Sequence, residues 1–278
     1  MTALARKAPP PAPSPRVELW ATVLLVWAGL VAIPLGLGEI AFSWDALNHH
    51  MYLGWTAFSP RFDRDFVGAG YQAYQYPYLY WPAYKLAALG VSGMWAGAVL
   101  NSLYVSVVPA LWLLARACVP QAGWEGTLLR VGAVILAFLA QLPLSLMDVT
   151  ANDLLAGIPM VWAVALAIVA MEGPAPRGWF TPARLVSLSG VAAGLAVAAK
   201  FSNGPIGLLL PLLWVLPRGS WMDRLRNVVR GGLWSIVAFL LAYGYWGWQL
   251  WDHFGNPMYP FYDYYFGMLR AAVGWRQP

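Results

Sequence analysis

Long apolar segments recur along the whole chain, and they constrain the fold more than any other feature. A membrane-spanning helix needs about 20 apolar residues, each adding about 1.5 Å. Of the 278 residues, 60% are hydrophobic and only 10% are charged, whereas soluble domains carry about 25% charged residues. We therefore predict an all-α fold, a polytopic transmembrane helical bundle with about seven spans. The predicted spans are 17–38, 94–117, 130–147, 153–171, 184–200, 204–217 and 231–251.

The segments outside these spans divide the chain further. Residues 1–16 are rich in proline and alanine, which predicts a disordered cytoplasmic tail ahead of a transmembrane core over 17–251. The first outer loop, 39–93, and the last segment, 252–278, are rich in tyrosine and tryptophan. Because these side chains join an apolar ring to a polar tip, we expect both segments to lie at the outer interface. "KFSNGP" at 200–205 leaves open whether 184–217 forms two spans or a re-entrant pair.

The distribution of basic residues predicts the orientation. With a cytoplasmic N-terminus, eleven of the 17 lysines and arginines would be cytoplasmic and six would lie outside. This predicts a multi-pass protein of the plasma (inner) membrane with its C-terminus on the outer face. Most carboxylates and all three histidines then share that face, so we place any site there. The net charge is +5, but the basic residues form no stripe of the kind typical of nucleic-acid binding. The single cysteine, Cys118, excludes an internal disulfide.

The stretch "SWDALNHH" follows the first span. Ser43 is a candidate N-cap, with Asp45 in the first turn of a helix and His49 on the same face at i+4. Asp45 could simply complement the helix dipole. Alternatively, it is a carboxylate at the membrane boundary that accepts a proton from a bound substrate.

The two adjacent histidines, His49 and His50, would diverge by about 100° on an α-helix, so they could not easily hold one metal ion together. Hydrogen bonding to a sugar hydroxyl or a phosphate suits them better. Asp45, His49 and Asp148 could still supply ligands. We therefore predict no metal site and no certain cofactor, while a divalent metal stays a minority option.

Further charged residues should lie on the outer face. Asp148 and Asp153 flank a short loop, "MDVTAND", where Asp153 could cap the following helix. Both could also frame a polar pocket with Asp45, since acids at a membrane boundary need solvation or pairing. Lys200 could snorkel to the interface or neutralise a lipid phosphate. "DRD" at 63–65 matches a metal-binding DxD pattern, but Arg64 between the acids also indicates local ion pairing.

Several motifs in order resemble a known family. They are "SWDALNHHMYLGW", "YPYLYWPAYKLA", "LMDVTANDLLAG", "GLAVAAKFSNGPIGLLL" and a G-N-P-x-x-P pattern within "YGYWGWQLWDHFGNPMYPFYDYY". Together they resemble the GT-C superfamily of polytopic, lipid-linked-sugar glycosyltransferases, more narrowly its family 87-like hexosyltransferases. The order covers nearly all of the chain after residue 17. Members usually have more spans, so the resemblance is to their shared core.

The resemblance implies a function and a site. A hexose would pass from a polyprenyl-phosphate donor to a lipid or cell-envelope glycan acceptor on the outer face, with Asp45 as catalytic base. Asp148 and Asp153 would be assisting acids. The donor phosphate or the substrates would contact the following residues: Lys200, Arg64, His49, His50, Tyr76 and Asn256.

Two functions of other classes remain open from the sequence. One is a transporter or flippase for a lipid-linked sugar, which would favour ionisable residues near the bilayer midplane. The other is a non-catalytic subunit of a glycan assembly complex with a membrane-protein partner. Membrane lipid is a predicted partner in every case, and nucleic acid is not.

Overall fold

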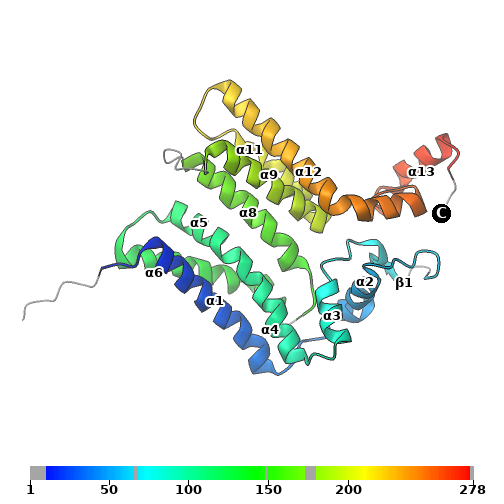
Figure 1. The fold of residues 1–278 in the computed structure, drawn as a ribbon, viewed down its shortest axis with the longest axis horizontal. Helices are drawn as coiled ribbons and strands as arrows, with labels where there is room; N and C mark the ends of the chain where they lie inside the picture. Colours follow the sequence, from blue (N-terminus) through cyan, green and yellow to red (C-terminus); the bar gives the residue numbers. More distant parts are fainter. Residues whose placement is uncertain (1–10, 66–67, 148, 173–179, 276–278) are drawn as a thin grey trace, which may run out of the picture.

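Helices account for most of the residues that the structure describes, and five of these helical segments are long and apolar enough to cross a membrane (Figure 1). The computed structural model describes residues 11–65, 68–147, 149–172 and 180–275. The candidate spans are α1 (Pro15–Leu37), Gly93–Cys118, Asp153–Met171, α9 (Pro182–Ala199) and α12 (Trp221–Phe254). The prediction of a helical, multi-pass fold is thus confirmed, whereas seven spans stay a prediction.

The second candidate span is not one uniform helix. It consists of α4 (Gly93–Tyr104), the short 3-10 turn η3 (Val105–Val107) and α5 (Val108–Cys118). The third is the greater part of α8 (Asp153–Glu172). Figure 1 shows α1, α4, α5 and α6 (Gly123–Phe138) on one side and α8, α9, α11 and α12 on the other. Buried side chains of α1, α5 and α6 form one hydrophobic cluster, and α8, α9 and α11 (Pro211–Trp214) build another.

Local signals fix both ends of α1. The Ser14 side chain accepts a hydrogen bond from the backbone of Val17, and Pro15 occupies the first helical position, where its missing N–H costs nothing. Gly38 ends the helix with a φ of 79°, a left-handed conformation that favours glycine. The helix begins two residues before the predicted span, and residues 1–10 of the predicted tail lie outside the described residues.

Glycines allow α9 and α12 to pack closely. A Cβ atom at Gly190 would lie 2.2 Å from the carbonyl oxygen of Gly231, and one at Gly194 would lie 2.1 Å from that of Ser235. Small residues at such contacts let two membrane helices approach backbone to backbone. The outer sides of the helices carry exposed apolar residues, such as Leu241 at 81% exposure, as expected for a surface in contact with lipid.

Two predicted spans are interrupted. The segment predicted as 130–147 forms α6 and then a short helix, α7 (Gln141–Ser145), because Pro143 cannot donate the backbone hydrogen bond of a continuous helix. The segment predicted as 204–217 forms α10 (Gly204–Leu209) and α11, which Pro211 separates for the same reason.

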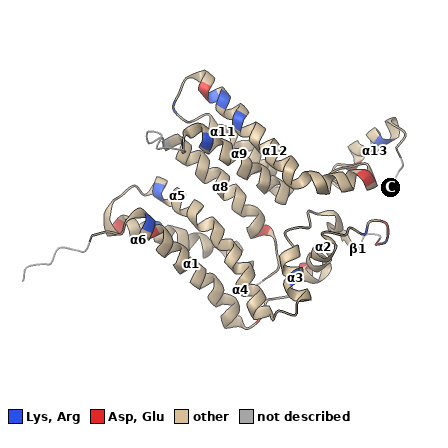
Figure 2. Ribbon diagram, viewed as in Figure 1, with Lys and Arg blue, Asp and Glu red and all other residues tan. Residues whose placement is uncertain are grey.

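Charged residues gather at the two ends of the bundle, and the middles of the helices are almost free of them (Figure 2). One end, which we call the Glu18 end, joins the start of α1 to Trp112, Thr127 and Arg130 through hydrogen bonds. At the other end, the Asp153 end, Ala41 pairs with Val149 and Lys200 with Asp153. The segment 39–93, the predicted first outer loop, places Asp45, His49 and His50 at the Asp153 end.

Short elements cover the Asp153 end. The first outer loop folds into a π-helical turn and several short pieces rather than long helices, and the aromatic residues of this loop pack on the end of α12. The chain then ends in one more described helix, α13 (Asp263–Ala272) (Figure 1). The elements of the first outer loop are η1 (Ala46–His50), α2 (Met51–Thr56), β1 (Gly68–Tyr71), η2 (Gln72–Tyr74) and α3 (Trp81–Ala88).

Candidate functional site

The stretch around Asp45 forms a helix start, as predicted. The Ser43 hydroxyl accepts a hydrogen bond of 3.1 Å from the backbone N–H of Ala46, the bond expected of an N-cap. Asp45 stands in the first turn with its side chain 54% exposed, and its Oδ1 lies 3.8 Å from Nδ1 of His49. The two residues therefore share a face.

The two histidines differ from the prediction in one respect. Residues 46–50 form a π-helical turn, which is wider than the predicted α-helical one and occurs often at functional sites, and both histidines line the same cavity. Both rings are buried, with their centroids 4.4 Å apart. His50 also stacks on Tyr80 at 4.7 Å, and its Nδ1 lies 2.8 Å from the Thr150 hydroxyl.

These residues line a polar cavity of about 310 Å³ at the Asp153 end of the bundle. Its wall combines the first outer loop with the loop before α8 and the end of α9. Of the three predicted site acids, the two that the structure describes, Asp45 and Asp153, both contribute to it. The other lining residues are Ser43, His49, His50, Gln72, Gln75, Tyr80, Ser145, Leu146, Val149, Ala151 and Lys200.

Lys200 reaches this cavity because α9 ends immediately before it. Its backbone is extended, with a φ of −158°, and its Nζ lies 2.5 Å from Oδ1 of Asp153 and 3.4 Å from Oδ1 of Asn152. The side-chain amide of Asn203 bonds the carbonyl oxygens of Ala156 and Ala196. These hydrogen bonds fix the turn after Lys200 against α8 and α9. The stretch "KFSNGP" therefore ends α9 and separates it from α10.

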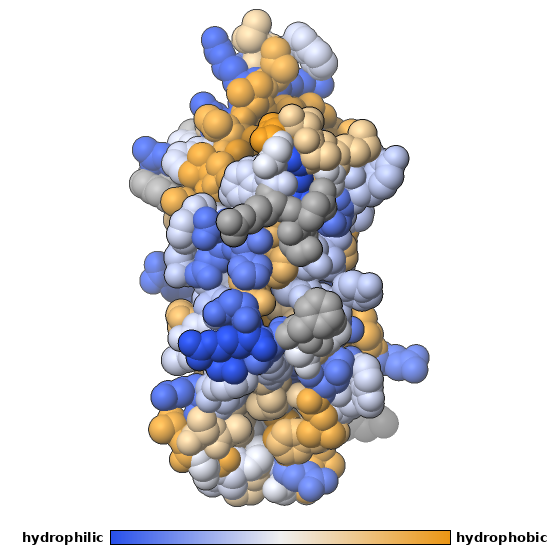
Figure 3. Space-filling model, turned by 90° about the vertical axis from the view of Figure 1, so that its right-hand side faces the viewer, coloured by the Kyte–Doolittle hydropathy of each residue, from blue (hydrophilic) through white to orange (hydrophobic). Residues whose placement is uncertain are grey.

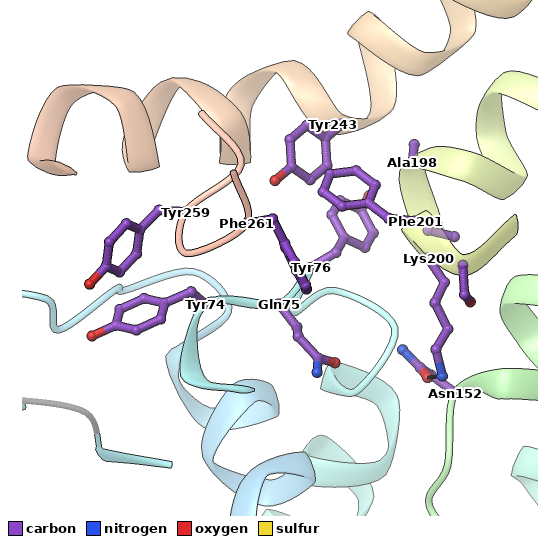
Figure 4. A pocket seen from close by; sticks show the side chains of 12 residues that line it. Tyr74, Gln75, Tyr76, Asn152, Ala198, Lys200, Phe201, Tyr243, Tyr259 and Phe261 are labelled. Atoms are coloured by element: carbon purple, nitrogen blue, oxygen red, sulfur yellow. Dashed lines mark hydrogen bonds between the residues drawn. The ribbon is translucent and has the colours of Figure 1, made fainter. Parts of the chain in front are cut away.

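A second cavity, of about 320 Å³, adjoins the first and shares Lys200 and Gln75 with it. Half of its twelve lining residues are aromatic, and the predicted substrate contact Tyr76 is one of them. Figure 4 shows rings from the first outer loop, the end of α9, α12 and the last segment arranged around this space. They are Tyr74, Tyr76, Phe201, Tyr243, Tyr259 and Phe261.

Burial controls the protonation of the histidines. It is the main reason that the pKa of His50 is lowered to about 4, and the neighbouring His49 adds to the effect, while Asp45 and Asp153 oppose it. Burial likewise lowers the pKa of His49, against the opposing charge of Asp45. Both rings are therefore neutral at pH 7. Burial, with both acids nearby, raises the pKa of Tyr80.

Some predicted site residues lie elsewhere. Arg64 lines a separate hollow together with Asp63, and Asp65 of the same motif pairs with Arg61 at 2.5 Å; the "DRD" stretch thus makes local ion pairs. Asn256 is fully buried, and its side chain bonds Met258, Phe261 and Asp263, so it organises the last segment. The structure does not bring Arg64 or Asn256 to either cavity. Asp148 lies outside the described residues.

The structure adds residues that the sequence analysis missed. Gln72, Gln75 and Tyr80 line the polar cavity, although we interpreted their segment only as an interfacial aromatic stretch. Two glutamines inside the aromatic run "YQAYQYPYLYW" were the available signal, because isolated amides are not needed in an interface belt.

Among the residues that the structure describes, no group of three or more metal-ligating side chains comes together. Seen from the side that carries α13 and the first outer loop, hydrophilic residues cross the middle of the surface, with apolar residues above and below (Figure 3).

Comparisons of the chain with family models, with curated proteins and with solved structures give no match.

Proposed function

We propose that this protein is an integral-membrane glycosyltransferase that moves a hexose from a polyprenyl-phosphate donor to a lipid or cell-envelope glycan acceptor. The observation that carries this proposal is the meeting of Asp45, Asp153 and Lys200 at one polar cavity, next to an aromatic one. The donor has a polar sugar, a charged phosphate and an apolar lipid in that order. The two adjoining cavities and the lysine between them offer matching surroundings for each part.

Each part of the donor has a proposed position. The first isoprenoid units would occupy the aromatic cavity beside Tyr76. The phosphate would lie at Lys200, which lines both cavities, and the hexose would enter the polar cavity. Lys200 is paired with Asp153 in the free protein, so phosphate binding would exchange one anionic partner of this lysine for another, or share it between them.

The residues of the polar cavity then fit a single displacement step. Asp45 accepts the proton of an acceptor hydroxyl, whose oxygen forms a bond to the anomeric carbon of the hexose. The bond between that carbon and the phosphate oxygen breaks, and the lipid phosphate leaves with the electron pair. Lys200 stabilises its negative charge. Attack from the side opposite the leaving group inverts the anomeric configuration.

The topology of the proposal follows from the charge distribution. The Asp153 end would face the outside of the plasma membrane, with the N-terminus in the cytoplasm and the C-terminus outside. The segments 123–147 and 201–214 would then also cross the bilayer as short or broken spans, which gives seven crossings of a GT-C-like core. Broken backbone at membrane depth is tolerated where it is buried in protein, and here the Asn203 side chain donates hydrogen bonds to carbonyl oxygens of α8 and α9.

Replacement of the base tests the proposal. We expect Asp45→Asn to lower the rate of hexose transfer from a polyprenyl-phosphate hexose to membrane glycan by about 10²- to 10⁴-fold, because the amide cannot accept the proton. The assay uses proteoliposomes and a radiolabelled donor. Asp63→Asn is the matched control, since Asp63 is exposed and lies outside both cavities, and it should keep the wild-type rate.

Two results would contradict the proposal. Hexose transfer by Asp45→Asn at the wild-type rate would show that Asp45 is not the catalytic base. Movement of the labelled donor across the vesicle membrane, with no transfer by the wild-type protein, would assign the chain to transport instead.

A further inference from the structure

Two buried polar atoms in the residues that line the polar cavity have no hydrogen-bond partner within the described structure. They are Nδ1 of His49 and Oε1 of Gln72. More than about 90% of buried polar groups in folded proteins have a partner, so each exception needs an explanation. Two such atoms at one cavity indicate a ligand that supplies the missing hydrogen bonds.

The distance between His49 and Asp45 shows what such a ligand must be. Their Nδ1 and Oδ1 atoms are 3.8 Å apart, which is too far for a direct hydrogen bond. One oxygen atom placed about 2.7 Å from Oδ1 of Asp45 and about 2.9 Å from Nδ1 of His49 would span this gap, with an angle of about 85° at that oxygen between the two contacts. Asp45 is half exposed and His49 is buried behind it, so the ligand arrives from the side of Asp45.

We propose that this wall is a subsite for a hexose ring of the acceptor. One hydroxyl of that ring bridges Asp45 and His49, and another hydroxyl of the same ring donates to Gln72. The inference rests on the proposed function, where the bridging group is the acceptor hydroxyl that Asp45 deprotonates. The hydroxyl donates its proton toward Asp45 and accepts a hydrogen bond from the His49 ring. His49 thereby positions the nucleophile, and Gln72 sets the orientation of the acceptor ring.

The chemistry of the wall favours a hydroxyl over an anion. Asp45 and Gln72 offer acceptors, and an anionic phosphate would meet the negative charge of Asp45. A hydroxyl both donates and accepts, so it matches a wall made of two acceptors and one ring N–H. The lowered pKa of His49, caused mainly by its burial, keeps the ring neutral.

Ligand binding without any donor tests the subsite apart from catalysis. The probes are the methyl α-pyranosides of mannose, glucose and galactose, each at 100 mM, with the protein in lipid nanodiscs. We expect at least one of them to raise the Tm by about 3 °C or more, as a ligand present well above its Kd does. The fully O-methylated forms, which cannot donate a hydrogen bond, should give no shift.

Variants locate the binding. Asp45→Ala, His49→Phe and Gln72→Met should each abolish the shift, because each removes one polar partner. His49→Asn should keep most of it, since the asparagine amide replaces Nδ1 at nearly the same place. If His49→Phe fails to fold, the other three variants still test the subsite. Asp45→Ala changes a half-exposed side chain, and Gln72→Met and His49→Asn are measured separately beside it.

The outcomes separate this inference from the proposed enzyme. No shift with any free pyranoside, an equal shift with the O-methylated forms, or an unchanged shift in Asp45→Ala and Gln72→Met would overturn the subsite, even if transfer is intact. Specific binding without sugar transfer would keep the subsite and overturn the glycosyltransferase. In the transfer assay, His49→Phe should raise the acceptor KM about tenfold and leave the donor KM unchanged, with His49→Asn close to wild type.

Discussion

The two ends of the bundle hold their charges in opposite ways. At the Glu18 end, Glu18 is 3% exposed, and both of its carboxylate oxygens accept hydrogen bonds. The donors are Trp112, Thr127 and Arg130, and Arg130 also donates to the carbonyl oxygens of Val119 and Gln121. At the Asp153 end, Asp45 is half exposed and lies 3.8 Å from Nδ1 of His49, an atom with no hydrogen-bond partner among the described residues.

This contrast separates a structural cluster from a site. The Glu18 cluster connects α1, α5 and α6 and leaves no carboxylate oxygen to bind anything else. A buried pair of this kind stabilises only while both partners are present, because either charge alone is costly in a low-dielectric interior. The cluster around Asp45 retains unused hydrogen-bonding capacity beside a cavity. It therefore contributes less to stability and offers more to a ligand.

The largest expected effect is on stability at the Glu18 end. Glu18→Gln leaves the Arg130 guanidinium buried without its counter-charge, and we expect it to lower the free energy of unfolding by about 3–5 kcal/mol. The midpoint of thermal unfolding in nanodiscs measures the change. The double variant Glu18→Leu/Arg130→Met, which removes both charges, should be more stable than Glu18→Gln.

Glu125→Gln is the matched control for this prediction. Glu125 lies two turns or less from Thr127 and Arg130 on α6 but is exposed, so its loss should change the free energy of unfolding by no more than about 0.5 kcal/mol. Equal loss in Glu18→Gln and Glu125→Gln would show that the cluster does not hold the helices together.

A smaller effect on stability is expected from His50 and depends on pH. Its pKa is lowered from 6.5 to about 4 in the folded protein, so between these values the unfolded chain binds the proton and the folded one does not. Stability is therefore complete above about pH 6.5 and falls as the pH drops toward 4, by up to about 3 kcal/mol. Thermal unfolding at pH 7.5 and pH 5 measures this loss.

Two variants isolate the contribution of His50. His50→Asn keeps a polar atom near Thr150 without a titrating ring, and we expect it to reduce the loss of stability between pH 7.5 and pH 5. His253→Asn is the control, because His253 is exposed, and it should show the wild-type dependence. An unchanged pH dependence in His50→Asn would mean that other groups cause it.

The sequence allowed much of this comparison to be predicted, and the reasons are physical. Span-length apolar runs predict helices because backbone groups in lipid must be satisfied internally, and the described part of the chain contains five such helices. Asp45, Asp153 and Lys200 could be placed at one end because the spans alternate in direction. The capping role of Ser43 also followed from local chemistry.

Other features depend on contacts that no local pattern encodes. Residues 46–50 form a π-helical rather than an α-helical turn, and His50 contacts Tyr80 and Thr150 from distant parts of the sequence. Arg64 and Asn256 carried plausible chemistry, but ion pairs in one case and turn hydrogen bonds in the other keep them from the cavities. The glutamines were missed because their aromatic neighbours dominate the segment.

The smallest expected effect on stability is at Lys200, and it sharpens the comparison most directly. Lys200 and Asp153 form an ion pair whose side chains are 31% and 48% exposed, so Lys200→Met should cost no more than about 1 kcal/mol of unfolding free energy. If Lys200 holds the leaving phosphate, the same substitution should lower transfer by about 10²-fold or more. Asp153→Asn should lower the free energy of unfolding by an equally small amount. A loss in Lys200→Met as large as that in Glu18→Gln, with transfer unaffected, would make both ends of the bundle structural.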